Sequence, residues 1–278
     1  MLNGDRLQNA IVAKIMNGKV FVSCIQSIGL YGVPQGEKQT HDQKLKASLS
    51  RSKSAVLELA YCNSWDMFVT ITFDKTKVVD RHNVQETMCN MRTWLNNYKK
   101  RHAKSLKYLL IPELHKDGAV HVHGLISGVP NDKFKLFSSY SEEEIIKNDW
   151  SKLANEGYYN WLDLAKKFGR NSCGKIKSHE AVSYYVTKYI SKDMVSAVTE
   201  RNLNTYYASQ GLSRAEKVGI YDSEKVSVAK LKWDWQATSV DTETGELIET
   251  STYKKTFDDM SQFQLWLKLN GITKIKEN

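Results

Sequence analysis

Two short stretches of the chain carry side chains that can do chemistry. In "AVHVHGL" the imidazoles of His121 and His123 are two residues apart, and in "SYYVTKYISKD" the pattern Tyr-x-x-Lys occurs twice. On a strand, residues two apart project from the same face, so both histidines can reach one metal ion. A tyrosine oxygen can form a covalent ester with phosphorus, and a nearby ammonium group or metal favours its ionised form. Together the two stretches predict metal-assisted attack on a phosphate.

Glu113 is the third expected metal ligand. The loop "KDG" before the histidines has glycine in its third position, which suits a three-residue hairpin. In that register Glu113 lies opposite His121, with Cβ atoms within ~5.5 Å. A two-residue loop would instead place it opposite Val122 and break the cluster. Two imidazoles and a carboxylate suit Mg²⁺ or Mn²⁺ and also accept Zn²⁺, with His115 as a reserve ligand. The alternative is two histidines satisfied within a sheet.

The second stretch is expected to form a helix, capped at Ser178. Four chemistry-bearing residues lie within a ~100° arc at 3.6 residues per turn: Tyr185, Lys188, Tyr189 and Lys192. A neighbouring apolar stripe is formed by Val182, Val186 and Ile190, so the phenols stand at the edge of the core. Tyr184 points elsewhere on the helix and is expected to pack. Taken alone, a Tyr-x-x-Lys pattern usually reflects packing.

The elements that position these residues are read from periodicity. "MFVTITF" predicts a strand with Thr70 and Thr72 on the face opposite three apolar side chains. Asn83 and Glu86 form a capping-box pattern before an amphipathic helix that ends in the basic run "YKKRHAK". Strands "KYLLIPEL" and "AVHVHGLI" follow, then helix and irregular structure over residues 141–170, and a short strand "GKIKS". These elements predict an α+β domain.

The two ends of the chain are expected to flank that domain. Residues 1–64 are expected to hold small strands and a basic helix, whose Arg51 and Lys53 can meet phosphates or simply face solvent. Residues 65–200 are the expected catalytic core. Residues 201–278 predict a hairpin around "DTETG" and a helix that stops at Asn270, all packed on the core. In the hairpin, Trp233 and Trp235 can stack bases, although sheet core is the alternative.

Composition narrows the class of protein. Forty Lys and Arg residues against 31 Asp and Glu give a net charge of +9 and a pI near 9.1, which favours a polyanionic partner. Four scattered cysteines contain no C-x-x-C pair, so reduced thiols in a cytoplasmic protein are expected. No 18-residue apolar stretch occurs, which argues against a membrane span. No phosphate-binding Gly-rich loop occurs, so a nucleotide-driven helicase is not expected.

In order along the chain, these motifs resemble those of the rolling-circle replication initiators of the HUH endonuclease superfamily. The matching residues are "FVTITF", then His121-Val122-His123 with Glu113 upstream, then "YVTKYISK", so the resemblance covers roughly residues 65–193. The doubled Tyr-x-x-Lys is similar to that of two-tyrosine phage initiators, whereas the Glu113 spacing also resembles single-tyrosine viral ones. The resemblance implies a central antiparallel sheet flanked by helices, ferredoxin- or RRM-like, with the metal site on its central strands.

The resemblance also implies a mechanism. A tyrosine attacks the scissile phosphate, a 5′-phosphotyrosine forms, and the freed 3′-hydroxyl primes synthesis. We expect Tyr185 to be the first nucleophile and Tyr189 the second, with Lys188 and Lys192 steadying phosphate or phenolate charge. Expected DNA contacts are Thr70, Thr72, Arg51 and Lys53. The implied partners are single-stranded or hairpin origin DNA and a host helicase and polymerase, in a bacterial cytoplasm.

Three other classes remain open. HUH relaxases and single-stranded transposases use the same chemistry, although relaxases usually place the tyrosine before the histidine motif and the small transposases are shorter chains. A non-catalytic DNA-binding regulator would use the same basic surface and predicts no metal requirement and no covalent adduct. A zinc-stabilised structural fold is disfavoured, since structural Zn²⁺ sites prefer cysteine ligands.

Overall fold

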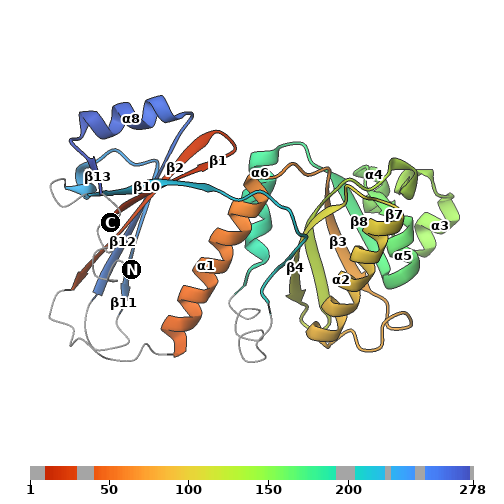
Figure 1. Cartoon of the computed structure of the whole chain (residues 1–278). Coiled ribbons are helices and arrows are strands. Elements are labelled where there is room, and N and C mark those ends of the chain that lie inside the picture. The colour runs from red at the N-terminus through yellow and green to blue at the C-terminus, as the bar shows by residue number, and fades with distance from the viewer. Residues whose placement is uncertain (1–9, 30–40, 192–203, 223–226, 242–247, 276–278) are drawn as a thin grey trace. The chain divides into compact units, whose positions relative to one another are not determined.

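The structure is a computed structural model that describes residues 10–29, 41–191, 204–222, 227–241 and 248–275 (Figure 1). Contacts divide the chain into two units, one of Met1–Lys38 with Arg214–Asn278 and the other of Gln39–Ser213. These units differ from the three consecutive segments expected from the sequence. Residues 39–64 group with the central segment, and the two ends of the chain group together.

The unit Gln39–Ser213 is built on an antiparallel sheet. Its described strands have the order β6-β7-β8-β3-β5-β4-β9. The expected α+β class, with a central antiparallel sheet flanked by helices, is confirmed. The strands are β3 (Met67–Phe73), β4 (Lys107–Leu114), β5 (Val120–Ser127), β6 (Phe134–Leu136), β7 (Tyr159–Trp161), β8 (Gly169–Lys175) and β9 (Tyr207–Ala208).

One expected strand was misplaced. The stretch "GKIKS" was expected to be a short strand, but β8 begins at Gly169 and ends at Lys175, so most of that stretch follows the strand. The polar segment 169–173 pairs with β3 from Phe73 to Val69 because its apolar Cys173 and its amide-bearing Asn171 are both buried there. A local pattern does not reveal such pairing. The three-residue strand β7 within residues 141–170 was not expected either.

Helices cover both faces of this sheet (Figure 1). On one face α2 and α5 pack against Val69, Ile71 and Val122. On the other, α1 and α6 lie side by side and pack against Leu109, Ile111 and Leu125. None of the described helices is long and apolar enough to cross a membrane. Their bounds are α1 (His41–Tyr61), α2 (Val84–Arg101), α3 (Glu142–Lys147), α4 (Ser151–Asn155), α5 (Leu162–Phe168) and α6 (His179–Val186), with 3₁₀ turns η2 (Asn131–Lys133), η3 (Phe137–Ser139) and η4 (Thr187–Tyr189).

Helix α2 forms as the sequence predicts. The Asn83 side chain accepts a hydrogen bond from the Glu86 backbone N–H, which satisfies one of the free donors at the helix start. The apolar stripe expected from spacings of three and four is buried. At the other end, three basic side chains occupy the last turn, where they complement the helix dipole. The buried stripe includes Val84, Met88, Met91, Leu95 and Tyr98.

The second unit holds another antiparallel sheet, with the described strands in the order β11-β12-β2-β1-β10-β13. The expected hairpin is confirmed, because β11 pairs with β12 from Trp235↔Lys254 to Asp241↔Ile248. The expected helix is α8, capped by Asp259 and followed by Asn270 and by Gly271 at φ +65°. The elements are β1 (Ile11–Met16), β2 (Lys19–Gly29), β10 (Glu216–Asp222), η5 (Val228–Lys230), β11 (Trp235–Asp241), β12 (Ile248–Phe257), α8 (Met260–Leu269) and β13 (Thr273–Lys274).

The core of this unit separates the two tryptophans of the hairpin. Trp233 packs against the core beside Tyr253 and Trp266, so the expectation of sheet core holds for it. Trp235 is 49% exposed, and the Lys254 ammonium lies 4.9 Å from its ring centroid. Only the second of the two therefore offers a face to a base.

Candidate active site

The hairpin that carries the histidines has the predicted register. Gly118 has φ +80° and donates its N–H to the His115 carbonyl at 2.8 Å, while the His115 N–H donates to the Ala119 carbonyl at 2.9 Å. This is a three-residue loop with its glycine in the left-handed region. It places Glu113 directly opposite His121, as the sequence indicates. The side chains of Glu113, His121 and His123 therefore stand on one face of the sheet.

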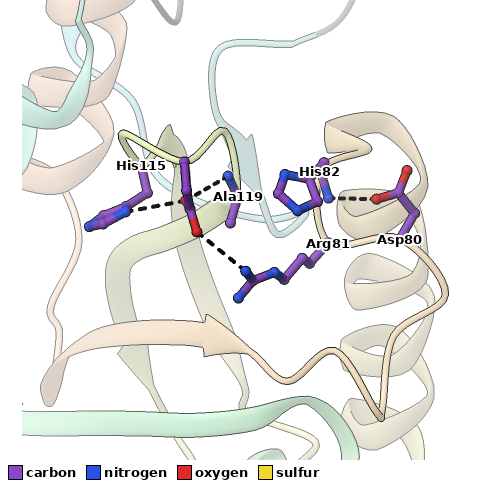
Figure 2. Close-up of polar contacts among 6 residues, drawn as sticks. Asp80, Arg81, His82, His115 and Ala119 are labelled. Atoms are coloured by element: carbon purple, nitrogen blue, oxygen red, sulfur yellow. Dashed lines mark hydrogen bonds and ion pairs between the residues drawn. The ribbon is translucent and has the colours of Figure 1, made fainter.

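The hairpin loop is tied down by the Asp117 carboxylate, on which three groups converge (Figure 2). The Ala119 N–H donates to it at 3.0 Å, and its oxygens lie 3.3 Å from His115 Nδ1 and from Arg81 Nη2. The Arg81 carbonyl also accepts the Val120 N–H at 2.8 Å. The segment after β3 thus holds the start of β5 in place, three residues before His123.

His123 is a buried, neutral imidazole held by two side chains. Its Nε2 lies 2.7 Å from Glu113 Oε2, and its Nδ1 lies 3.2 Å from Thr70 Oγ1. Burial lowers the pKa of His123 to about 4, and the positive charge that His121 and Lys188 would place nearby adds to this. A neutral ring donates from one nitrogen only, and a carboxylate only accepts. His123 therefore donates from Nε2 to Glu113 and accepts at Nδ1 from the Thr70 hydroxyl.

His121 faces the same way but has a different partner. Its ring stacks on His115, with centroids 4.8 Å apart and an interplanar angle of 13°. Burial, and then His115, lower its pKa below the ordinary value. Within the described residues, no three His, Cys, Asp or Glu side chains lie close enough together to hold a metal ion. The donor set is right for a divalent cation, but His121 must turn away from His115 to complete it.

The tyrosine helix is shorter than expected. Ser178 caps it, as predicted, by accepting the Ala181 N–H at 3.2 Å. However, the α-helix ends at Val186 and tightens into the 3₁₀ turn η4, so the expectation of one α-helix through residue 192 is wrong. The Thr187 hydroxyl donates to the Tyr184 carbonyl at 2.7 Å, and such side-chain bonds compete with the helical ladder. Lys192 lies outside the described residues.

The two tyrosines meet but have unequal surroundings. Tyr189 donates its hydroxyl to the Tyr185 hydroxyl at 3.0 Å. Tyr189 is only 9% exposed and stacks on His123, with centroids 3.8 Å apart. Tyr185 is 47% exposed. The structure thus brings both phenols to the histidine that contacts Glu113, and only Tyr185 presents its oxygen openly to a substrate.

Charge reinforces this difference. The Lys188 ammonium lies 3.7 Å from the centroid of the Tyr185 ring and 4.7 Å from that of Tyr189. A hydrogen bond from Lys188, and then the one from Tyr189, lower the pKa of Tyr185. Burial, followed by donation to Tyr185, raises the pKa of Tyr189. Tyr185 is therefore the phenol that ionises first.

Phe68 joins these groups and was missed in the sequence. Its ring centroid lies 5.4 Å from that of Tyr185, 5.9 Å from that of Tyr189 and 6.3 Å from that of His123. A signal for it existed, because Phe68 alternates with Thr70 and Thr72 on the same face of β3. It acts as the floor on which the tyrosines and the imidazole are packed.

A cleft of about 620 Å³ opens beside the tyrosines. Phe68, Thr70, Tyr185 and Tyr189 line it near the histidine. Three lysines that the sequence analysis did not single out also line it: Lys152, Lys175 and Lys177. The cleft thus combines a phenol oxygen with positive charge, which is what a phosphate-bearing strand needs.

The remaining predicted residues lie farther from this cluster. Thr72 is on the same face as Thr70 and pairs with His121. Arg51 and Lys53 are exposed on α1, and neither has a contact with the tyrosines in the described part of the chain. Tyr184 packs edge-on against Tyr61, with centroids 6.5 Å apart, although 46% of it is exposed.

These features define an α+β protein whose sheet carries a His-x-His strand beside a helix with paired tyrosines. Residues 66–194 match the sequence model of a family of replication-associated proteins, described by its member Replication-associated protein ORF2. The resemblance to replication initiators is thereby confirmed over this segment, which contains the histidine hairpin and both tyrosines.

Other comparisons add little. No curated protein matches the chain. Among solved structures, the N-terminal nuclease domain of non-structural protein 1 of minute virus of mice is similar, with 13% identity over 77% of this chain and 73% of that chain and a TM-score of 0.12. That domain is described as having a unique Zn²⁺ coordination in its active-site pocket. The likeness is too weak to say more about this chain.

Proposed function

We propose that the chain is a rolling-circle replication initiator that nicks single-stranded origin DNA with Tyr185. One observation carries the proposal. Within the segment that matches the replication-associated family, an exposed phenol accepts a hydrogen bond from a second phenol that is stacked on His123. An activated oxygen beside a cluster of phosphate-binding groups is the arrangement that nucleophilic catalysis at phosphorus requires.

The proposed reaction exchanges one phosphoester for another. The Tyr185 oxygen attacks the scissile phosphorus, the bond from phosphorus to the 3′ oxygen breaks, and the phenol proton leaves to water. The products are a 5′-phosphotyrosine and a free 3′-hydroxyl that can prime synthesis. In the reverse step a 3′-hydroxyl attacks the phosphotyrosine, the phosphodiester re-forms, and Tyr185 is released. Lys188 steadies the phenolate, and we expect Lys192 to steady phosphate charge.

A divalent cation, Mg²⁺ or Mn²⁺, is proposed at His121, His123 and Glu113. The neutral imidazole of His123 and the Glu113 carboxylate already lie at 2.7 Å, and both are donors that such ions accept. When bound, the ion would polarise the scissile phosphate. Thr70 fixes the ring of His123 through Nδ1, the kind of outer partner that orients ligating imidazoles.

Tyr189 is proposed to act second. Cutting and rejoining the displaced strand after one round needs a second nucleophile within reach of the same site. Tyr189 is placed for this, since its hydroxyl lies 3.0 Å from that of Tyr185. It must first leave its stack on His123, so its turn comes after Tyr185 has been esterified and can no longer accept its proton in the same way.

The substrate strand is proposed to lie in the 620 Å³ cleft, with phosphates near Lys152, Lys175 and Lys177. Thr70 and Thr72 would contact it beside the histidines, and Arg51 and Lys53 would meet it farther along α1. The proposed partners are single-stranded or hairpin origin DNA and a host helicase and polymerase in a bacterial cytoplasm. A relaxase or transposase would use the same chemistry. A non-catalytic DNA-binding regulator would form no covalent adduct.

The test is a covalent-adduct assay. Wild type, Tyr185→Phe, Tyr189→Phe and the double variant are incubated with Mn²⁺ and labelled single-stranded fragments that tile the protein's own replicon, and the products are run on a denaturing gel. We expect a protein-DNA band in wild type, its loss in Tyr185→Phe, and a weaker band in Tyr189→Phe. Absence of a band in wild type on every fragment would reject the nickase and favour the regulator. A band that disappears only in the double variant would make the two tyrosines interchangeable.

A further inference from the structure

A second, strongly basic cleft lies along α2. It has a volume of about 610 Å³ and is lined from the helix side by Arg92, Asn96, Lys99 and Lys100, with Lys104 just beyond the helix. The opposite wall comes from Tyr108 on β4 and from residues 208–210 at and after β9. We call this the α2 groove. It contains part of the basic run "YKKRHAK", for which the nicking site has no use.

The α2 groove is on the other face of the sheet from the tyrosines. Along β4, Leu109 and Ile111 pack with the tyrosine helix, whereas Tyr108 and Leu110 pack with α2. Side chains alternate between the faces of a strand, so the sheet itself separates the two clefts. They share no lining residue among those that the structure describes. A strand held at Tyr185 therefore does not occupy the α2 groove at the same point.

The charges of the α2 groove lie in one row. Arg92, Asn96, Lys99 and Lys100 are spaced by four, three and one, which places them on one face of a helix over ~12 Å at 1.5 Å per residue. Among the described residues, four cations line the groove and no carboxylate does. In the same part of the chain none of the four has a salt-bridge partner. Like charges gathered without counter-charge favour a polyanion as the occupant.

Neutral groups of the groove are also arranged for phosphate. The Tyr108 hydroxyl donates to Asn96 Oδ1 at 3.4 Å, which leaves the Asn96 amide N–H groups to donate outward. A smaller cavity of about 250 Å³ shares Arg92 and Ala208 with the α2 groove and continues it past Tyr207, over whose ring the guanidinium lies at 5.6 Å. The result is an elongated channel and not a round pocket for a single phosphate.

We infer that the α2 groove binds the backbone of a second length of single-stranded DNA, on the face of the sheet away from the nicking site. The identity of the polyanion as DNA rests on the proposed function. At 3.4 Å per nucleotide, ~12 Å of charge spans three to four phosphates. A single strand fits a channel of this volume, whereas a duplex would touch only its rim. The groove would hold DNA on one side of the nick while the tyrosines act on the other.

The test measures binding of the full chain to a fluorescent 30-nucleotide single strand over a range of salt concentrations. Wild type is compared with Lys99→Ala/Lys100→Ala and with the control Lys166→Ala/Lys167→Ala, which removes an exposed lysine pair from α5. Each phosphate contact contributes about 0.7 to the salt slope for single strands, so the groove variant should lose about 1.4 of slope and bind on the order of ten-fold more weakly at ~0.1 M salt. The control should match wild type.

Adduct formation separates this inference from the proposed function. On a short fragment that covers only the nick site, the groove variant should form the covalent band as wild type does. Wild type without any band but with a groove-dependent salt slope would reject the nickase and keep the groove. An unchanged slope, an equal loss in the α5 control, or a loss seen only with duplex DNA would each overturn the inference.

Discussion

Tyr185 and Tyr189 show how two residues of one type acquire different roles four positions apart. Tyr189 is held between His123 and Phe68 and gives its proton to Tyr185, whereas Tyr185 stands at the surface under the Lys188 ammonium. Burial opposes ionisation of the first, and donated hydrogen bonds favour ionisation of the second. The pair is therefore better described as a nucleophile with its donor than as two equivalent nucleophiles.

Lys188 makes a testable contribution to that asymmetry. Because its hydrogen bond is the largest cause that lowers the pKa of Tyr185, Lys188→Met should move the rising limb of the nicking rate to higher pH. The phenolate is the reactive form, so removing the cation raises the pKa and lowers the rate at pH 7, with recovery as the pH approaches the ordinary tyrosine value of ~10. Single-turnover rates from pH 6 to 10 measure this.

Lys188→Arg is the matched control, since it keeps the charge over the ring and should leave the limb near its wild-type position. If Lys188→Met lowers the rate by the same factor at every pH, the lysine acts on phosphate binding and not on the phenol.

At the level of elements, local patterns predicted the hairpin register and α2 correctly but not the end of α6. The glycine of the "KDG" loop and the Asn83 cap act on neighbouring residues, so a linear sequence displays them. The end of α6 at Val186 depends on the Thr187 hydroxyl outcompeting the backbone, which periodicity does not reveal. Phe68 was missed for another reason, since its role depends on contacts with residues more than 50 positions away.

Gly124 is an element-scale requirement of the site. A Cβ at this position would lie 2.3 Å from the Leu109 carbonyl oxygen and 3.0 Å from Leu110 Cα, so β4 and β5 pack closer than a side chain allows. Gly124→Ala should therefore lower the free energy of unfolding by about 3 kcal/mol. It should also weaken nicking, because pushing β4 away separates Glu113 from His123.

Urea unfolding of the two variants Gly124→Ala and Gly219→Ala checks this. Gly219 is also a strand glycine, but its added Cβ would meet only the far end of the Lys274 side chain, which can move aside. Its loss should stay within about 1 kcal/mol, as for a mild core substitution. Equal losses in the two variants would show that backbone crowding at Gly124 is unimportant.

At the scale of the whole molecule, the chain closes its second sheet with its own two ends. β2 pairs with β12 through ten residue pairs, from Ile248↔Gly29 to Phe257↔Val20, and β1 pairs with β10. Each of these strands was visible in the sequence as an apolar run. Their partners were not, because more than 200 residues separate the pairs, and patterns report local period and not long-range pairing.

This closure predicts which pieces of the chain fold alone. Both hydrophobic clusters of Gln39–Ser213 draw only on residues of that unit, and Asn63 fastens its end through hydrogen bonds with the Ser213 backbone at 2.9 Å. A fragment of residues 39–213 should unfold cooperatively on heating and, under the proposed function, form the covalent adduct. A fragment of residues 214–278 lacks β1 and β2, so β12 and β10 each lose a ladder and the fragment should show no cooperative transition.

The rescue experiment makes the second claim sharp. Joining residues 10–38 through a flexible linker to residues 214–278 restores every strand of the described six-stranded sheet. That fusion should regain a cooperative thermal transition and the near-ultraviolet circular dichroism of the core tryptophans Trp233 and Trp266. Cooperative unfolding of residues 214–278 by themselves, or failure of the fusion while residues 39–213 fold, would show that the ends of the chain do not form a self-sufficient unit.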